Sequence, residues 1–231
     1  MSLLCHTKYF DMPPKQPHEE LAHIRGLMDR STRFLSLSGL SGVIAGVLAL
    51  AGAAMARWYM DQHAVVRTDP MTYDAGLLAE AYWAHVLNLG GIAVTVLVLA
   101  IVGALWFTLR RSRHTGQSLW DASAQRMVIN LAMPLAAGGL FCLALIWHGL
   151  PGLVAPATLL FYGLALLNAS KYTLDEIRWL GLSEVMLGLA ASFWVGAGLL
   201  FWALGFGVLH IFYGSLMYLR HERSTPSIDE A

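Results

Sequence analysis

The fold is decided by residues 86–109, which read VLNLGGIAVTVLVLAIVGALWFTL and contain no charged side chain. This run ends at Arg110-Arg111-Ser112-Arg113, a cluster of basic residues. An apolar stretch of about 20 residues is long enough to cross the hydrocarbon core of a bilayer as a helix. The bias extends through the whole chain, which has 57% hydrophobic residues and only 13% charged ones. Soluble domains carry roughly a quarter charged residues, so this sequence predicts an integral membrane protein.

Six stretches of this kind are predicted to be transmembrane helices. Each is an apolar run bounded by charged or turn-forming residues. Because the bilayer core contains no water, a spanning segment must satisfy its own backbone hydrogen bonds, as a helix does. The predicted fold class is therefore an all-α membrane protein, a six-helix transmembrane bundle over residues 34–219. The six stretches cover residues 34–55, 82–109, 127–147, 153–170, 179–195 and 199–219.

Both ends of the chain lie outside the predicted bundle. Residues 1–17 are polar and contain Met12-Pro13-Pro14, which predicts a flexible tail. In residues 18–33, apolar side chains recur at helical spacing opposite charged ones, which predicts a short amphipathic helix on the membrane surface. The alternative is a polar tail that becomes helical only beside the membrane. Residues 220–231 are predicted to be a short cytoplasmic tail.

The basic residues predict the orientation of the bundle. Of the 15 lysines and arginines, only Arg57 and Arg67 fall on one side of a six-span bundle, and all the others fall on the opposite side. Loops rich in lysine and arginine face the cytoplasm. Both termini and the loop after residue 109 are therefore predicted to be cytoplasmic, in a bacterial-type plasma (inner) membrane.

Small residues at helical spacing predict close helix packing. Gly39, Gly42 and Gly46 occur on the first helix, and Gly188 and Ser192 occur on the fifth. Small side chains let two helices approach until their backbones touch, and the dispersion attraction at that short distance drives helix association in lipid. We therefore expect the first helix to be packed on two sides and to lie at the centre of the bundle.

Two short motifs recur along the chain. Residues 39–46 read GLSGVIAG and residues 181–188 read GLSEVMLG, so five of the eight positions are identical. The triplet Phe161-Tyr162-Gly163 recurs as Phe212-Tyr213-Gly214. One interpretation is a set of three related hairpins around an axis along the membrane normal. The other is coincidence among membrane segments that share a small alphabet of residues.

Glu184 and His210 are ionisable residues within predicted spans, and such residues need an explanation. Each lies thirteen residues from Ala197, the centre of a tight turn between the fifth and sixth helices. Residues equidistant from the turn of an antiparallel hairpin lie at the same depth, so the two side chains are predicted to pair. The pair is interpreted either as a structural lock or as a proton- or ligand-binding site.

Three more polar residues belong to the same half of the membrane when residues are counted along their helices. They are Asn130, Asn168 and Tyr213. Together with Glu184 and His210 they are candidates for lining an inward-facing polar cavity. Taken singly, each is also explained by helix-end capping or by a hydrogen bond between helices.

Histidines on the outer side suggest an alternative site. His85 opens the second helix, His148 ends the third, and His63 lies in the first outer loop. Neutral imidazole binds first-row transition metals, and two histidines can hold a haem. The spacing contains no local chelating pair, so no cofactor is predicted, and haem or a transition metal remains the alternative.

Composition and motifs leave three classes of function open. The first is a small-molecule or ion binding and transport component. The second is an accessory subunit of a larger membrane complex or homo-oligomer, with no chemistry of its own. The third is a haem- or metal-binding membrane protein. An enzyme is disfavoured because no phosphate loop, nucleophile elbow or metal motif is present.

The expected partner is the lipid bilayer. A net charge of zero argues against nucleic acid as a partner, since a protein that follows phosphates needs a basic excess. In size and predicted topology, the chain is similar to the substrate-binding membrane subunits of energy-coupling-factor transporters, which also have six spans and cytoplasmic termini. No motif carries this likeness, so it implies a six-helix fold and transfers no residue roles.

Overall fold

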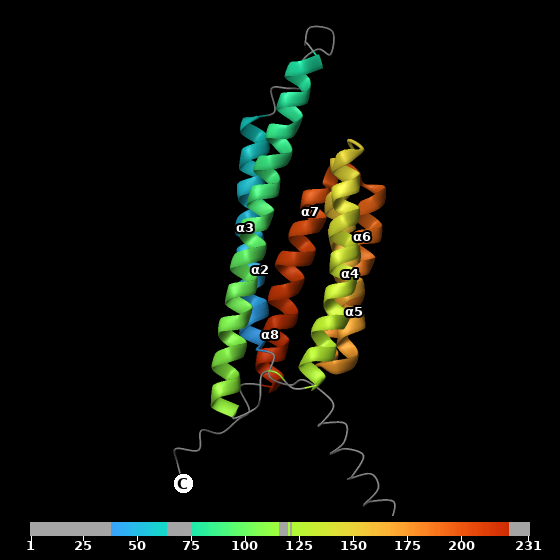
Figure 1. The fold of residues 1–231 in the computed structure, drawn as a ribbon. Coiled ribbons are helices and arrows are strands. Elements are labelled where there is room, and N and C mark those ends of the chain that lie inside the picture. The colour runs from blue at the N-terminus through green and yellow to red at the C-terminus, as the bar shows by residue number, and fades with distance from the viewer. Residues whose placement is uncertain (1–37, 64–74, 116–119, 121, 222–231) are drawn as a thin grey trace, which may run out of the picture. The chain divides into compact units, whose positions relative to one another are not determined.

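The computed structural model describes residues 38–63, 75–115, 120 and 122–221. Nearly all of these residues are helical, and none of them forms a strand (Figure 1). The predicted all-α fold class is therefore confirmed. The predicted flexible tail, the amphipathic helix over 18–33 and most of the C-terminal tail lie outside the described residues.

The described helices follow the predicted order. The first five long ones are α2 (Gly39–Gln62), α3 (Ala75–Thr115), α4 (Ala122–Trp147), α5 (Val154–Ala169) and α6 (Asp175–Phe193). The last helix is built from α7 (Gly198–Trp202), the π-helical segment η5 (Ala203–Leu209) and α8 (His210–His221). Three short 3₁₀ turns connect them: η2 (Pro151–Leu153), η3 (Ser170–Tyr172) and η4 (Val195–Ala197).

Among the described residues, five helical stretches are long and apolar enough to cross a membrane. α6 is long as well, but Asp175, Glu176, Arg178 and Glu184 make it more polar than the others. Between five and six helices of the described residues therefore fit a membrane-spanning role, which supports a multi-pass membrane protein. The five stretches are Gly39–Gln62, Glu80–Arg110, Ala122–Trp147, Pro151–Tyr172 and Val195–His221.

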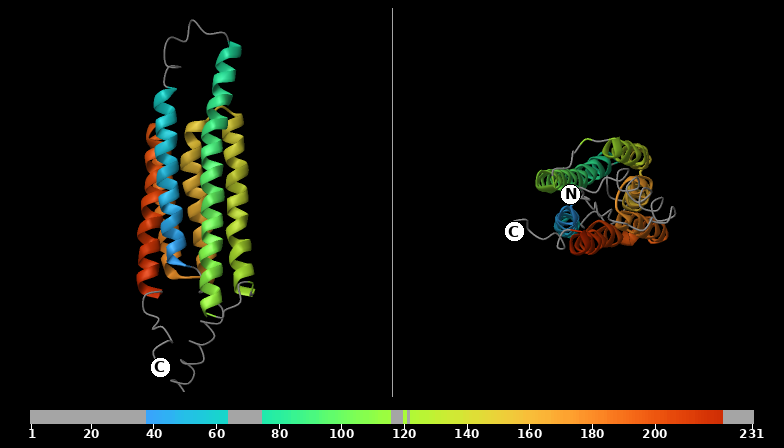
Figure 2. Two further views of the ribbon diagram at one scale, coloured as in Figure 1. Left: turned by 90° about the vertical axis from the view of Figure 1, so that its left-hand side faces the viewer. Right: turned by 90° about the horizontal axis from the view of Figure 1, so that it is seen from below.

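The helices pack side by side, each against its neighbours, in the order α3, α2, α8, α6, α5, α4 (Figure 2). As expected, α2 is packed on two sides, against α3 and against α8. It is not the central helix, however. The last helix contacts α2 on one side and α6 and α5 on the other, so it connects the α2–α3 pair to the group formed by α4, α5 and α6. Small residues on a helix favour close contact with a neighbouring helix, but they do not indicate how many neighbours that helix has.

Glycines hold two of these interfaces at backbone contact. A Cβ atom on Gly46 would lie 2.6 Å from the carbonyl oxygen of Gly207, and one on Gly42 would lie 3.2 Å from the Cα of Gly214. Gly39 likewise faces the backbone of Gly214, closer than any side chain would allow. Between α5 and α6, Gly188 faces the backbone at Leu160. Ser192 differs from these glycines: it is exposed, and its hydroxyl donates to the carbonyl of Gly188 in its own helix.

Candidate functional site

The predicted pair of Glu184 and His210 exists in the structure. Oε1 of Glu184 lies 3.4 Å from Nδ1 of His210. Glu184 is fully buried, and His210 is only 7% exposed. Glu184 is the central residue of α6, so in a membrane-spanning α6 the pair lies near the middle of the bilayer.

The local structure explains why the two side chains meet. The turn between α6 and the last helix is at η4, the position from which equal depth was counted. Beyond it, η5 is π-helical, and His210 is the first residue after that segment. Single-turn π-helical segments inside α-helices occur frequently at functional sites. Gly205 within η5 has no side chain, and a Cβ there would collide with the Glu184 carboxylate and with Leu159.

Tyr162 on α5 completes the cluster. Nδ1 of His210 lies 3.1 Å from the carbonyl oxygen of Gly205, which can only accept, so Nδ1 carries a proton and donates it. In the neutral imidazole, Nε2 is then an acceptor, and the Tyr162 hydroxyl donates to it at 2.8 Å. Phe206 stacks beside the imidazole, with ring centroids 5.8 Å apart, and covers it with an apolar surface.

Glu184 is the unusual member of the cluster. Both carboxylate oxygens are buried, and among the described residues neither accepts a hydrogen bond. Nδ1–H of His210 lies 3.4 Å from Glu184 but donates to the closer Gly205 carbonyl, so the carboxylate is left without a hydrogen bond from it. An orphaned buried polar group calls for an explanation, such as a bound ion, water, or a catalytic or binding role. The arrangement therefore provides a place for a further proton or hydrogen-bond donor.

The other predicted cavity residues form separate links. The side-chain amide of Asn168 donates to the Asn130 carbonyl at 3.0 Å, which joins α5 to α4. The Asn130 amide donates to its own helix, at the Arg126 carbonyl. The Tyr213 hydroxyl lies 3.4 Å from the Ser183 hydroxyl and joins α8 to α6. Within the described part of the chain, no hydrogen bond connects these residues to Glu184, so a common cavity remains a prediction.

Among the described residues, the three outer histidines do not form a chelating group. Nδ1 of His63 lies 2.9 Å from the carbonyl oxygen of Tyr59, and the His63 ring stacks on the Tyr59 ring. The same tyrosine ring lies 5.1 Å from that of His85. His148 directly follows α4 and is exposed. Among the described residues, no three His, Cys, Asp or Glu side chains are arranged to hold a metal ion. Haem or metal binding is the alternative and not the prediction, and it stays untested.

Sequence reasoning missed an ionic cluster where α6 begins and α8 ends. Oε1 of Glu176 accepts from Arg220 at 3.2 Å and lies 3.3 Å from Nε2 of His221. Burial by itself would raise the pKa of the Glu176 carboxyl, but hydrogen bonds from its own backbone, Arg220 and His221 stabilise the anion and hold its pKa below the usual range. The counting that paired Glu184 with His210 places these residues near equal depth too, so the signal was present.

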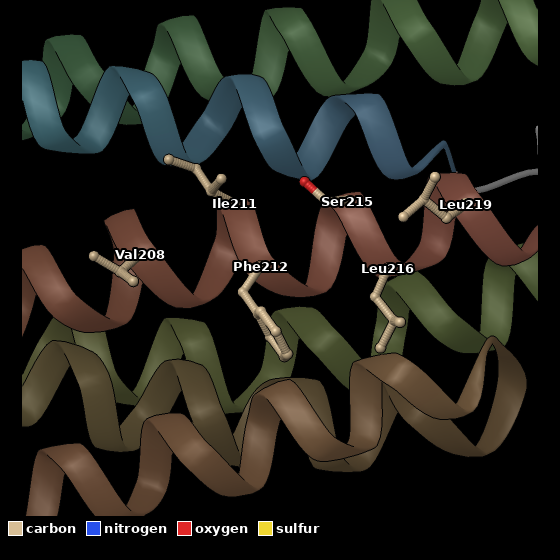
Figure 3. Close-up of a pocket in the computed structure, with 6 residues that line it drawn as sticks. All are labelled: Val208, Ile211, Phe212, Ser215, Leu216 and Leu219. Carbon is tan, nitrogen blue, oxygen red and sulfur yellow. The ribbon is translucent and has the colours of Figure 1, made fainter.

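An apolar groove of about 440 Å³ follows one side of the last helix (Figure 3). Its lining residues recur at helical spacing, and Ser215 is the only polar one. The groove therefore suits contact with apolar groups and not with ions. The ionisable groups lie elsewhere, in the Glu184–His210–Tyr162 cluster. The lining residues are Val208, Ile211, Phe212, Ser215, Leu216 and Leu219.

Comparison of the chain with protein-family models, curated proteins and solved structures finds no match. Function is therefore inferred from the geometry of the cluster.

Proposed function

We propose that the protein is a component of proton-coupled small-molecule or ion transport in a bacterial-type plasma (inner) membrane, with Glu184, His210 and Tyr162 as its proton-binding site. The observation that supports this proposal is the burial of both Glu184 oxygens without a hydrogen-bond donor among the described residues. A lock that served structure alone would satisfy its polar groups, because each buried unsatisfied group costs about 1–3 kcal/mol.

The cluster has a defined way to take up a proton. When the imidazole is neutral, Nε2 accepts from the Tyr162 hydroxyl. A proton added at Nε2 makes His210 a cation, and the Tyr162 oxygen then becomes the acceptor. The imidazolium forms an ion pair with Glu184, which is 3.4 Å away. A proton added to Glu184 instead removes the buried charge and creates an O–H donor. Chains of Glu and His within membrane spans carry protons in pumps and transporters.

The proposed topology has six spans, with α6 as the fifth of them and both termini in the cytoplasm. The distribution of basic residues supports this orientation, and the packing of α6 against α5 and α8 supports its crossing the membrane with them. In this topology the Glu176–Arg220 cluster lies on the cytoplasmic side, and Arg57 lies on the outer side.

The exposed apolar surface of α3 favours a second function, that of an accessory subunit. In the most apolar window of α3, none of the residues is buried against the described part of the chain. Trp106 is 66% exposed, and a Cβ on Gly90 or Gly91 would meet nothing within 4 Å. A partner helix, or a second copy of the chain, has room on α3.

A proton titration of the purified protein tests the proposal. The parent is expected to take up one proton more than Glu184→Gln over the same acid-going pH interval, since the variant retains the shape of the side chain without its ionisable group. Gln62→Glu, a carboxylate added at an exposed helix end, is the control for a residue in water. Identical uptake by the parent and Glu184→Gln would overturn the proposal.

A further inference from the structure

Two helix interfaces in the structure correspond residue for residue. Gly181 stands 142 positions after Gly39, and Gly163 stands 51 positions before Gly214. The first shift converts the residues of α2 into those of α6. The second converts the residues of α8 into those of α5. If the α2–α8 and α5–α6 interfaces are equivalent, every close contact in one must appear in the other under the same two shifts.

The first contact is made by the glycine of the Phe-Tyr-Gly triplet. A Cβ on Gly214 of α8 would lie 2.7 Å from the backbone nitrogen of Val43 and 2.8 Å from the carbonyl oxygen of Gly39. A Cβ on Gly163 of α5 would lie 2.7 Å from each of the same two atoms at the corresponding positions of α6. The partner atoms, and not only the glycines, therefore correspond.

The second contact is made by the glycine that ends the other motif. A Cβ on Gly46 of α2 would lie 2.6 Å from the Gly207 carbonyl oxygen and 3.0 Å from the Ile211 nitrogen. A Cβ on Gly188 of α6 would lie 3.1 Å and 2.7 Å from the same two atoms at the corresponding positions of α5. Shared composition explains why glycines recur in membrane helices, but it does not explain matching partner atoms under fixed shifts.

We infer that α2 with α8 and α5 with α6 are two copies of one structural unit, and that the Glu184–His210–Tyr162 cluster is the joint at which a bound proton changes their relative position. The order of the helices agrees with a series of hairpins, α2–α3, α4–α5 and α6–α8. In such a series, the first helix of one hairpin packs on the second helix of another. This inference rests on the proposed function, because it assigns a movement to the same proton site.

The cluster lies between the units and belongs to neither alone. Tyr162 and Glu184 come from the α5–α6 unit, and His210 comes from the α2–α8 unit. The counterpart of Glu184 in α2 is Gly42, and the counterpart of His210 in α5 is Leu159. Each unit is held internally by backbone contact at glycines, while the ionisable side chains of the cluster lie where the units meet. Sites of transporters with internal repeats are likewise formed at the repeat interface.

The effect of protonation at the cluster depends on the ionisable groups that face Glu184. They are His210 from the last helix and Tyr162 from α5. α2 has no charged residue before Arg57, and α4 has none after Arg126, so neither adds a charge at this depth. The other ionic contact between the units, Glu176 with Arg220, lies at the helix ends. Adding or removing one proton at the cluster therefore changes the charge where the units meet deep in the bundle. Helix shifts of about 1–2 Å at an interface are one known form of switching transition.

Distances between spin labels in the full-length protein test the inference. Label pairs within a unit are Leu40 with Leu219, and Lys171 with Arg178, all at helix ends on the same side. The pair across the joint is Leu40 with Arg178. Lowering the pH is expected to shift only the distance across the joint. Glu184→Gln at constant pH should fix that distance at its low-pH value.

The outcomes separate the two proposals. If Glu184 takes up its proton while the distance across the joint stays constant, the inference is overturned and the proposed function stands. If the distances within the units change as much as the distance across the joint, the units are not rigid and the inference is also overturned. If Glu184 takes up no proton, the proposed function itself fails.

Discussion

The one ring proton on Nδ1 of His210 is donated to the Gly205 carbonyl, and the buried Glu184 carboxylate lies beside it without a hydrogen bond. Glu184→Gln leaves His210 without its anion, and His210→Leu leaves the carboxylate without its nearest donor. Each single change should destabilise the protein by about 1–3 kcal/mol, because a buried polar group loses its partner. The double variant removes both charges, so its loss should be smaller than the sum of the single losses.

Thermal melts of the four proteins in one detergent measure this coupling. We expect an interaction free energy well above the roughly 0.3–0.5 kcal/mol within which independent sites are additive. Tyr162→Phe, which removes only the donor to Nε2, should give an intermediate loss. Strictly additive losses would show that the carboxyl and the imidazole do not interact.

Glu176 gives the stability of the protein a dependence on pH. Because its folded-state pKa is depressed, its contribution is fully present above the pKa of the unfolded chain. That contribution is lost as the pH falls through the lower, folded-state pKa. Glu176→Gln should therefore lower stability near neutral pH by about 1 kcal/mol, because the arginine of this ion pair is exposed to water, which weakens the attraction.

Melting temperatures of parent and Glu176→Gln, compared from neutral to acidic pH, check this prediction. The two curves should converge on the acid side. Asp61→Asn, which removes an exposed helix pair with Arg57, is the matched control and should shift stability by a few tenths of a kcal/mol. A gap between the parent and Glu176→Gln that widens in acid would contradict this explanation.

At the scale of the helix, α2 can approach the last helix closely because glycines, which have no side chain, lie at the contact. Gly46→Leu would drive a side chain into the backbone at Gly207, so we expect a loss of about 1–3 kcal/mol or more from overpacking. Gly139→Leu on α4 adds the same atoms where nothing lies within 4 Å. It should change stability by less than about 0.5 kcal/mol. Equal melting temperatures for the two variants would mean that α2 does not pack there.

The existence and order of the helices could be predicted because the thickness of the bilayer sets how many consecutive apolar residues a spanning helix needs. Their ends could not. α2 continues to Gln62, beyond the predicted end at residue 55. Arg57 pairs with Asp61 one turn later, and such a pair stabilises the helix beyond the apolar run. The end of an apolar run shows where the hydrocarbon core ends. The helix itself can continue beyond that point, because its backbone hydrogen bonds form within the helix.

The candidate site was predictable only in part. Counting from the turn at Ala197 paired Glu184 with His210, because a tight hairpin ties sequence distance to depth. Tyr162 comes from a helix outside that hairpin, so its contact depends on tertiary packing that no spacing indicates. The π-helical segment before His210 cannot be recognised from the spacing of residues either. The role of Gly205, which leaves room for the Glu184 carboxylate, is visible only in the structure.

At the scale of the whole molecule, the topology can be tested without knowing the activity. In a background with Cys5→Ser and Cys142→Ala, a cysteine at Gln62 should react with an impermeant thiol reagent added outside intact cells. A cysteine at Gln117, which follows α3 in the chain, should react only after the cells are opened. The reverse pattern would place the basic loops outside and invert the proposed orientation.

The measurement that tests the central claim most directly is the infrared difference spectrum of the protein between two pH values. A carboxyl that takes up a proton in an apolar site produces a carbonyl-stretch band that a carboxylate lacks. We predict such a band in the parent, its absence in Glu184→Gln, and a shift of the band in His210→Leu and Tyr162→Phe. A spectrum of Glu184→Gln identical to that of the parent would show that Glu184 does not titrate, and would contradict its role as the proton-binding group.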